Sequence, residues 1–200
     1  HSDPLPLGQT SLASQAHHIA KAVSQLGADH PIVLGQSYGG AVALAWALHE
    51  PAKPAALVLV SAVSLPWPGK LDPWYRLTST RIGAAIAIPL AAAFIPKSYI
   101  EGAISAVFAP SPVPPGYEVT IGTGLALRRE TLRINARQVN ELRGQIVVME
   151  PLYADLRLPI ELIHGTADTI VPLTVHSAPF ADQMPNSVLT IIEGAGHMPH

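Results

Sequence analysis

The chain has 200 residues, of which 48% are hydrophobic and 13% charged, with a formal net charge of −2 at pH 7. This composition is that of a globular domain rather than a disordered segment, and no cluster of Lys and Arg offers the electrostatic footprint that nucleic-acid binding needs. The chain contains no cysteine, which excludes disulfide frameworks, cysteine-based zinc sites and thiol catalysis.

Residues 1–64 predict alternating helices and strands. No secretory leader is evident at the start, and Ser11–Gly27 has apolar residues at helical spacing and ends on a glycine. Ile32–Gly35 and Ala55–Val63 are apolar runs typical of strands buried on both faces of a parallel sheet. Between them, Gly40–His49 predicts a helix that ends before a proline. This alternation favours a parallel α/β sheet.

Residues 65–150 have a different character. Prolines separate short apolar helical segments as far as Pro115, and Tyr117–Glu150 looks mostly helical. The longest apolar stretch, Ile82–Ile95, is too short to cross a bilayer. We interpret it as a buried or lid helix, with contact to a membrane surface as the alternative, and expect no obligate membrane partner. We expect the whole block to form a helical cap over the carboxyl edge of the sheet, where open α/β sheets bind ligands.

Residues 151–200 return to strand, helix and strand, at Ile160–Gly165, Leu173–Met184 and Ser187–Gly194. The predicted organisation is therefore a core in two parts, residues 1–64 and 151–200, interrupted by the cap of residues 65–150. The sequence assigns neither a compartment nor an oligomeric state.

A serine stands on the corner between the first predicted strand and the helix that follows it, in Gly-Gln-Ser-Tyr-Gly. A sharp strand-to-helix turn pushes the Ser37 side chain out at the sheet edge and aims free helix N–H groups at the same place. We attribute Gly35 and Gly39 to the close approach of neighbouring chain segments in such a turn. This pattern is typical of the nucleophile elbow, and here the chain resembles the α/β-hydrolase fold family.

The resemblance extends to an acid and a histidine, which follow the serine in that order in the family. Asp168 stands in an HG-x-x-D-x-x-V-P stretch after a predicted strand, and His197 in a G-x-G-H stretch after the last one. The resemblance implies that Ser37 attacks a carbonyl carbon, that His197 moves the proton, and that Asp168 orients the imidazole. It also implies that the backbone N–H of Tyr38 is an oxyanion donor.

Other titratable residues compete with this assignment. Asp155 is the rival acid, but it precedes a strand, and His200 is the rival base. His164 lies at a strand end and is predicted to pack, or to lie behind the catalytic residues, rather than to react. The remaining histidines are predicted to be solvated: His17, His18, His30, His49 and His176.

Gln36 and Trp67 are the predicted substrate contacts, beside an apolar pocket to which aromatic residues of the cap contribute. A packing role is the alternative for both the Gln36 and the Tyr38 side chains. No pair of histidines has the spacing of a metal site, and we expect neither a metal nor another cofactor.

The resemblance implies a serine hydrolase that cleaves a carboxylic ester, or a similar activated carbonyl of a small hydrophobic substrate, through an acyl-enzyme. Carboxylesterases are the commonest enzymes with such a triad. A thioesterase, a C–C bond hydrolase or an acyltransferase would use the same residues, and a non-catalytic binding protein on this fold is a further alternative. A serine at position 37 argues against haloalkane dehalogenases and epoxide hydrolases, which use an aspartate there.

The chain departs from the family at both ends. Only the tail of the family's G-x-G-x-S loop is recognisable, at His1–Pro4, and the chain ends at His200, where a final helix is expected. We therefore expect a fragment of a longer hydrolase that lacks the N-terminal strands of the sheet, the glycine-rich oxyanion loop and the last helix. Because one oxyanion donor is worth about 10²–10³ in turnover, we expect this fragment alone to be weakly active or inactive.

Overall fold

The computed structural model describes residues 8–69, 77–78, 80, 87–88 and 96–200. The elements up to the second strand are α1 (Leu12–Gln25), β1 (Ile32–Gln36), α2 (Tyr38–His49) and β2 (Ala56–Val60). A helical segment follows, with α5 (Lys97–Phe108), α6 (Tyr117–Thr120), α7 (Thr123–Ala126), α8 (Arg129–Met149) and the 3₁₀-helix η1 (Glu150–Asp155). The last elements are β3 (Ile160–Gly165), α9 (Ser177–Gln183) and β4 (Ser187–Ile192).

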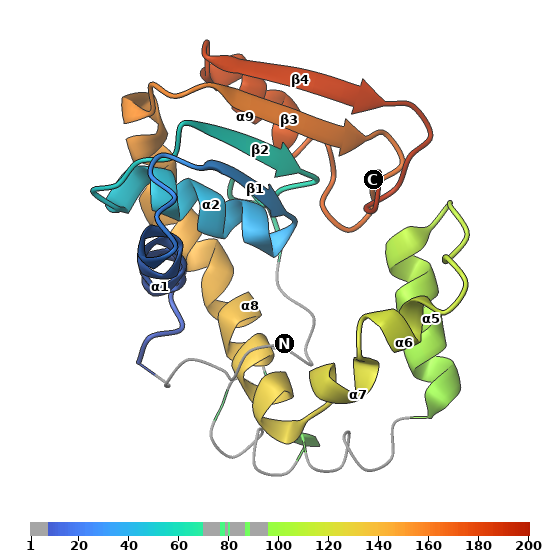
Figure 1. The fold of residues 1–200 in the computed structure, drawn as a ribbon. Helices are drawn as coiled ribbons and strands as arrows, with labels where there is room; N and C mark the ends of the chain where they lie inside the picture. The colour runs from blue at the N-terminus through green and yellow to red at the C-terminus, as the bar shows by residue number, and fades with distance from the viewer. Residues whose placement is uncertain (1–7, 70–76, 79, 81–86, 89–95) are drawn as a thin grey trace.

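The described strands form one parallel sheet in the order β1-β2-β3-β4, which confirms the predicted fold class. The strands have the same order in the sheet as in the chain. Each connection therefore leads to the adjacent strand and begins it at the same end of the sheet as the strand before. In Figure 1 the four arrows accordingly run in the same direction. Because the strands are parallel, all their carboxyl ends, and the loops that follow them, lie at one edge.

One hydrophobic core holds the sheet and its helices together. The inward side chains of the two central strands, among them Leu57, Leu59 and Leu162, are buried with residues of α1, α2, α8 and α9. Helix α2 is apolar on all sides, and residues 41–47 are all buried, as expected of a helix enclosed by other elements. The outward side chains of β1, at the edge of the described sheet, are exposed to solvent: Ile32 is 68% and Leu34 65% exposed.

Two predicted elements are shorter in the structure, each for a local reason. Strand β2 ends at Val60 because Ser61 has a φ of 44°, which is incompatible with extended backbone. Helix α9 begins at Ser177 rather than near residue 173. This start places Pro179 in the first helical turn, where the missing N–H of proline breaks no hydrogen bond.

The predicted helix over residues 117–150 is divided into α6, α7 and α8. Gly122 separates α6 from α7 with a φ of 62°, a left-handed conformation that interrupts a right-handed helix, and Arg128 separates α7 from α8 with a ψ of 140°. In Figure 1, α5, α6 and α7 stand apart from the sheet on the side toward which the strand arrows point. The assignment of residues 65–150 as a cap, with its boundaries, stays a prediction.

Most of the apolar stretch 82–95 lies outside the described residues, as do Trp74, Tyr75 and Phe94. Within the part of the chain that the structure describes, none of the helices combines the length and apolar character needed to cross a membrane.

Candidate active site

Ser37 lies between the last residue of β1 and the first residue of α2. Its backbone has φ 51° and ψ −120°, and a positive φ is rare for any residue other than glycine. The end of β2 holds this conformation, because the Ser37 N–H donates to the Val60 carbonyl at 3.0 Å and the Val63 N–H donates to the Ser37 carbonyl at 3.1 Å. Strain maintained by its surroundings in this way is typical of functional sites.

The glycines around Ser37 have unequal roles. A Cβ on Gly35 would collide with the carbonyl of Gly39 and lie 2.8 Å from the Cα of Gly40. A Cβ on Gly40 would collide with the side chain of Ala62, whereas a Cβ on Gly39 would meet nothing within 4 Å. The predicted crowding is therefore confirmed at Gly35 and wrong at Gly39. Only the Gly39 main chain takes part in the close contact, and the second crowded glycine is Gly40.

This difference predicts opposite outcomes for two alanine substitutions in the same turn. Gly35→Ala forces the β1 backbone away from α2 and is expected to cost about 1–3 kcal/mol of unfolding free energy, as overpacking does. Gly39→Ala fills open space in a helix and is expected to be neutral or stabilising. Urea unfolding of both variants measures the difference, and equal destabilisation by the two would contradict the described turn.

Asp168 lies in the loop after β3, with a fully buried side chain. Its Oδ1 accepts hydrogen bonds from the N–H groups of Ile170 and Val171, both at 2.9 Å, and its Oδ2 lies 2.8 Å from His197 Nδ1. Burial by itself would raise the pKa of Asp168. The hydrogen bonds from His164, His197 and Val171 outweigh it and hold the pKa well below the ordinary range. Asp168 is therefore an anion at neutral pH.

His197 lies in the loop after β4 and is 5% exposed. Because an ionised carboxylate only accepts hydrogen bonds, the His197 nitrogen that faces Asp168, Nδ1, carries a proton. In the neutral ring, Nε2 then has a free lone pair, as a general base requires. The predicted acid and histidine are thus brought together in the geometry of an oriented base.

The loops that carry Asp168 and His197 are fastened to each other. The Ala167 N–H donates to the Ala195 carbonyl at 2.9 Å, and the Gly194 N–H donates to Thr166 Oγ1, also at 2.9 Å. Gly165 permits this approach, since a Cβ there would collide with the Ala195 carbonyl. These contacts explain the glycine of the HG-x-x-D stretch.

Gln36 joins the Ser37 turn to the His197 loop. Its side-chain amide donates to the His197 carbonyl at 3.1 Å, so the residue before the serine holds the backbone of the histidine. Among the described residues, none forms a hydrogen bond with the Ser37 hydroxyl, and that hydroxyl is half-buried. The structure thus places Ser37 at the same sheet edge as the Asp168–His197 pair without a direct bond to it. The predicted contact of Gln36 with substrate stays a prediction.

Tyr38 begins α2, where the first N–H groups of a helix have no acceptor within it. Its hydroxyl accepts a hydrogen bond from Gln15 Nε2 of α1 at 2.7 Å, and its side chain packs against the hydrophobic core. Burial raises the pKa of this phenol. The structure therefore gives the side chain the packing role, and the oxyanion role of the backbone N–H stays a prediction.

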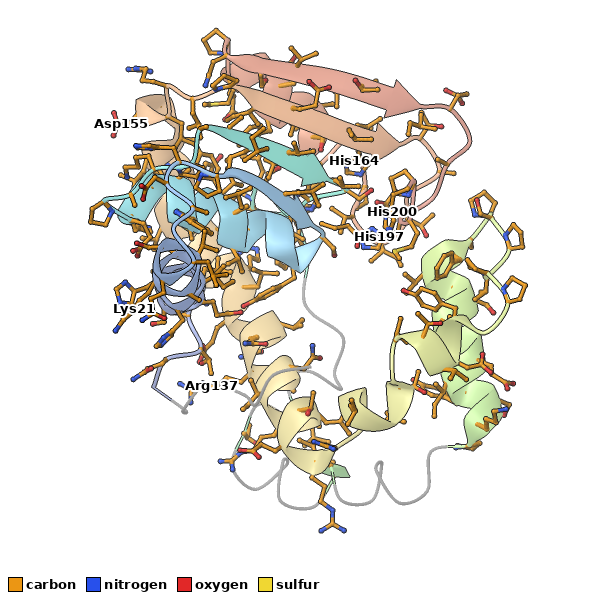
Figure 2. All side chains as sticks on the ribbon, viewed as in Figure 1. Lys21, Arg137, Asp155, His164, His197 and His200 are labelled. Atoms are coloured by element: carbon orange, nitrogen blue, oxygen red, sulfur yellow. The ribbon has the colours of Figure 1, made fainter. Side chains whose placement is uncertain are left out.

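The rival acid and base are poorly placed. Asp155 is exposed, and Figure 2 shows it at the end of the sheet opposite to His164 and His197. His200 lies near His197 in Figure 2 but is exposed, and it forms no ion pair with an acid among the described residues.

The prediction that five histidines are solvated holds for four of them and is wrong for His176. His176 is 3% exposed, its Nδ1 accepts a hydrogen bond from the Leu65 N–H at 3.3 Å, and burial lowers its pKa to about 4. It is therefore neutral and ties the start of α9 to the segment after β2. The Trp67 ring lies beside it, with ring centroids 6.1 Å apart, and the predicted contact of Trp67 with substrate stays a prediction.

Sequence reasoning did not find Ser177, whose hydroxyl lies 2.7 Å from Nδ1 of the buried His164. A serine at a helix start is too common to be singled out, and only the tertiary structure pairs it with a strand residue. Over the described residues, no group of three or more metal-ligating side chains could hold an ion.

Comparison with known proteins agrees with this architecture. The chain is 29% identical over 202 residues to an uncharacterized protein of Mycobacterium tuberculosis, a match that covers 97% of this chain and 58% of the relative. The chain thus spans less than two thirds of the length of that curated relative.

Two solved structures show the same fold at low sequence identity. An alpha/beta hydrolase fold protein from Burkholderia ambifaria aligns with a TM-score of 0.77 and 22% identity, over 98% of this chain and 70% of its own. An esterase from Exiguobacterium antarcticum aligns with a TM-score of 0.72 and 19% identity, over 99% and 71%. The model of the alpha/beta hydrolase family matches residues 1–200 in full. The chain therefore belongs to the alpha/beta hydrolase family.

Proposed function

We propose that the chain carries the catalytic centre of a serine hydrolase that cleaves a carboxylic ester through an acyl-enzyme. The observation that carries the proposal is the strained turn at Ser37 on the same sheet edge as the buried pair of Asp168 and His197, whose Oδ2 and Nδ1 are 2.8 Å apart. A serine hydroxyl needs an oriented base to become a nucleophile, and this edge offers one.

The proposed reaction has two halves. In the first, His197 Nε2 takes the proton of the Ser37 hydroxyl as Oγ bonds to the carbonyl carbon, and Asp168 stabilises the imidazolium. The imidazolium then gives that proton to the leaving alkoxide, the ester C–O bond breaks and an alcohol departs. In the second half, water attacks the acyl-enzyme with His197 again as base, and the free acid and the serine are restored.

In the proposed mechanism, the hydrogen bond between Ser37 and His197 forms when the substrate binds. Hydrogen bonds between catalytic groups are often long in ligand-free proteins and tighten in the Michaelis complex. Because the half-buried Ser37 has no competing hydrogen-bond partner among the residues that the structure describes, its hydroxyl can make that bond.

The developing oxyanion would be held by the Tyr38 N–H at the positive end of α2. In the family, a second donor comes from a glycine-rich loop, whose tail residues 1–4 resemble; these residues lie outside the described part of the chain. Since one donor is worth about 10²–10³ in turnover, we expect slow hydrolysis when Tyr38 acts alone.

A small hydrophobic ester is the proposed substrate class, bound between the sheet edge and a cap formed by residues 65–150. Phe108 and Tyr117 of this segment pack edge to face with ring centroids 4.7 Å apart, which gives the segment an apolar centre of its own. The fold similarity to an esterase is compatible with carboxylesterase activity. No metal or organic cofactor enters the proposed steps, and a non-catalytic binding role is the alternative that the assay must exclude.

The test is a pre-steady-state assay with p-nitrophenyl esters of increasing acyl length, at enzyme concentrations high enough to see one turnover. The proposal expects a burst of p-nitrophenol equal to the concentration of folded chain, followed by slower turnover, because acylation precedes hydrolysis. A folded chain that releases no p-nitrophenol above the buffer rate with any ester would favour the binding role.

A further inference from the structure

His164 lies next to the end of β3 and its side chain is completely buried. All its polar atoms have partners. Nδ1 lies 2.7 Å from Ser177 Oγ, and Nε2 lies 2.7 Å from the Val171 carbonyl oxygen and 3.2 Å from Asp168 Oδ2. Burying an imidazole costs free energy unless its nitrogens are hydrogen-bonded. The complete set of partners therefore indicates that His164 has a polar role as well as filling space.

The partners determine which nitrogen carries the proton. A carbonyl oxygen and a carboxylate both accept only, so Nε2 must carry the proton, which it donates to the Val171 carbonyl while lying 3.2 Å from Asp168 Oδ2. Ser177 can donate its hydroxyl proton to Nδ1, which makes the same tautomer the satisfied one when the ring is neutral. Ser177 therefore keeps the protonated nitrogen of His164 on the side of Val171 and the carboxylate.

Asp168 Oδ2 consequently faces two imidazole nitrogens that carry protons, His164 Nε2 at 3.2 Å and His197 Nδ1 at 2.8 Å. Four N–H groups surround the carboxylate in all, since Ile170 and Val171 occupy Oδ1. The remaining titratable neighbour is His176, whose charge interactions reach both His164 and Asp168 and which is neutral.

We propose that His164 is a positioning residue for Asp168, and that Ser177 acts through it by fixing its tautomer. This inference rests on the proposed function, in which Asp168 orients His197. The His164 N–H holds the carboxylate in the rotamer that faces His197 and offsets part of its negative charge. It thereby limits how strongly Asp168 stabilises the His197 imidazolium, which must give up its proton within each half of the reaction.

Three variants separate this role from packing. His164→Leu removes the donor at similar volume, His164→Gln keeps an amide N–H near the position of Nε2, and Ser177→Ala removes the partner of Nδ1. We expect His164→Leu to lower kcat/KM about 10-fold, as the loss of one charge-assisted hydrogen bond does. We also expect it to move the acidic limb of the pH profile upward by about half a unit, because the less neutralised carboxylate attracts the His197 proton more strongly.

His164→Gln is the matched control, expected to stay within about threefold of the parent rate with the acidic limb in place. Ser177→Ala is expected to shift the acidic limb of the pH profile in the same direction as His164→Leu, by a smaller amount. If His164→Leu does not fold, the shift in Ser177→Ala tests the positioning role. Equal losses in the Leu and Gln variants, or an unmoved limb in His164→Leu and Ser177→Ala, would overturn the inference.

A measurement without substrate distinguishes this inference from the proposed function. In the ¹⁵N-histidine-labelled chain, the imidazole ¹⁵N spectrum should show His164, assigned by its loss in His164→Gln, with a protonated Nε2 and an acceptor-type Nδ1. A protonated Nδ1 with a bare Nε2 would overturn the inference even in an active enzyme. The expected tautomer in a chain without ester hydrolysis would instead count against the proposed function alone.

Discussion

Replacing Ser37 by alanine is expected to reduce ester hydrolysis to the buffer rate while leaving the fold intact. Loss of the nucleophile in such a triad costs up to about 10⁶ in kcat, since the oriented histidine has no hydroxyl to activate. The Ser37 side chain makes no hydrogen bond to any residue in the part of the chain that the structure describes. We therefore expect the p-nitrophenol burst to disappear and the urea unfolding midpoint to change little.

Ser64→Ala is the matched control for this loss. Its hydroxyl is buried and has no hydrogen-bond partner among the described residues, and the backbone carbonyl that accepts from Tyr153 is unaffected by the change. We expect wild-type burst amplitude and turnover in this variant. A burst that survives in Ser37→Ala would show that another group is the nucleophile.

Replacing Asp168 by asparagine is the second change with a large expected effect. An asparagine keeps the shape of the side chain, but its amide can donate to His197 Nδ1 and so favours the wrong tautomer. By analogy with the same change in a serine-protease triad, we expect a loss of about 10⁴ in kcat. Asp155→Asn, which alters the exposed rival acid, is the control and is expected to leave kcat unchanged. Similar losses in both variants would contradict the assignment of the acid.

Asp168→Asn is also expected to change how the free energy of unfolding depends on pH. The folded-state pKa of Asp168 lies below the ordinary value of 3.8, so the ionised group stabilises the fold at pH values above 3.8. This contribution is lost as the pH falls below that value toward the folded-state pKa. Urea unfolding from pH 7 down to pH 3 should therefore show an acid-dependent loss in the parent chain that is smaller in Asp168→Asn.

Much of the sheet edge could be predicted from the sequence because its signals are local. The apolar runs, the glycines around Ser37 and the turn residues before Asp168 lie within a few positions of the elements that they define. Periodicity and turn chemistry report such short-range constraints well. The parallel sheet followed from the alternation of these elements.

The features that were missed depend on contacts between segments far apart in the chain. His176 was interpreted as solvated because it lacks the spacing of an acid partner or a metal site, yet the structure buries it at the start of α9, where it accepts a hydrogen bond from Leu65, 111 positions away. The crowding at Gly40 comes from Ala62 of the segment after β2. The link between Gln36 and the His197 carbonyl spans 161 positions. Pattern reasoning on one sequence has no access to such pairs.

The most direct measurement of the central claim is the site at which a fluorophosphonate probe reacts with the folded chain. The probe bonds covalently to a serine only where a base activates the hydroxyl, so it reports the first half of the proposed reaction without needing full turnover. Peptide mapping by mass spectrometry should find one adduct, on Ser37, and none after denaturation or in His197→Gln. A folded chain that stays unlabelled at Ser37, or that is labelled there equally well without His197, would contradict the account.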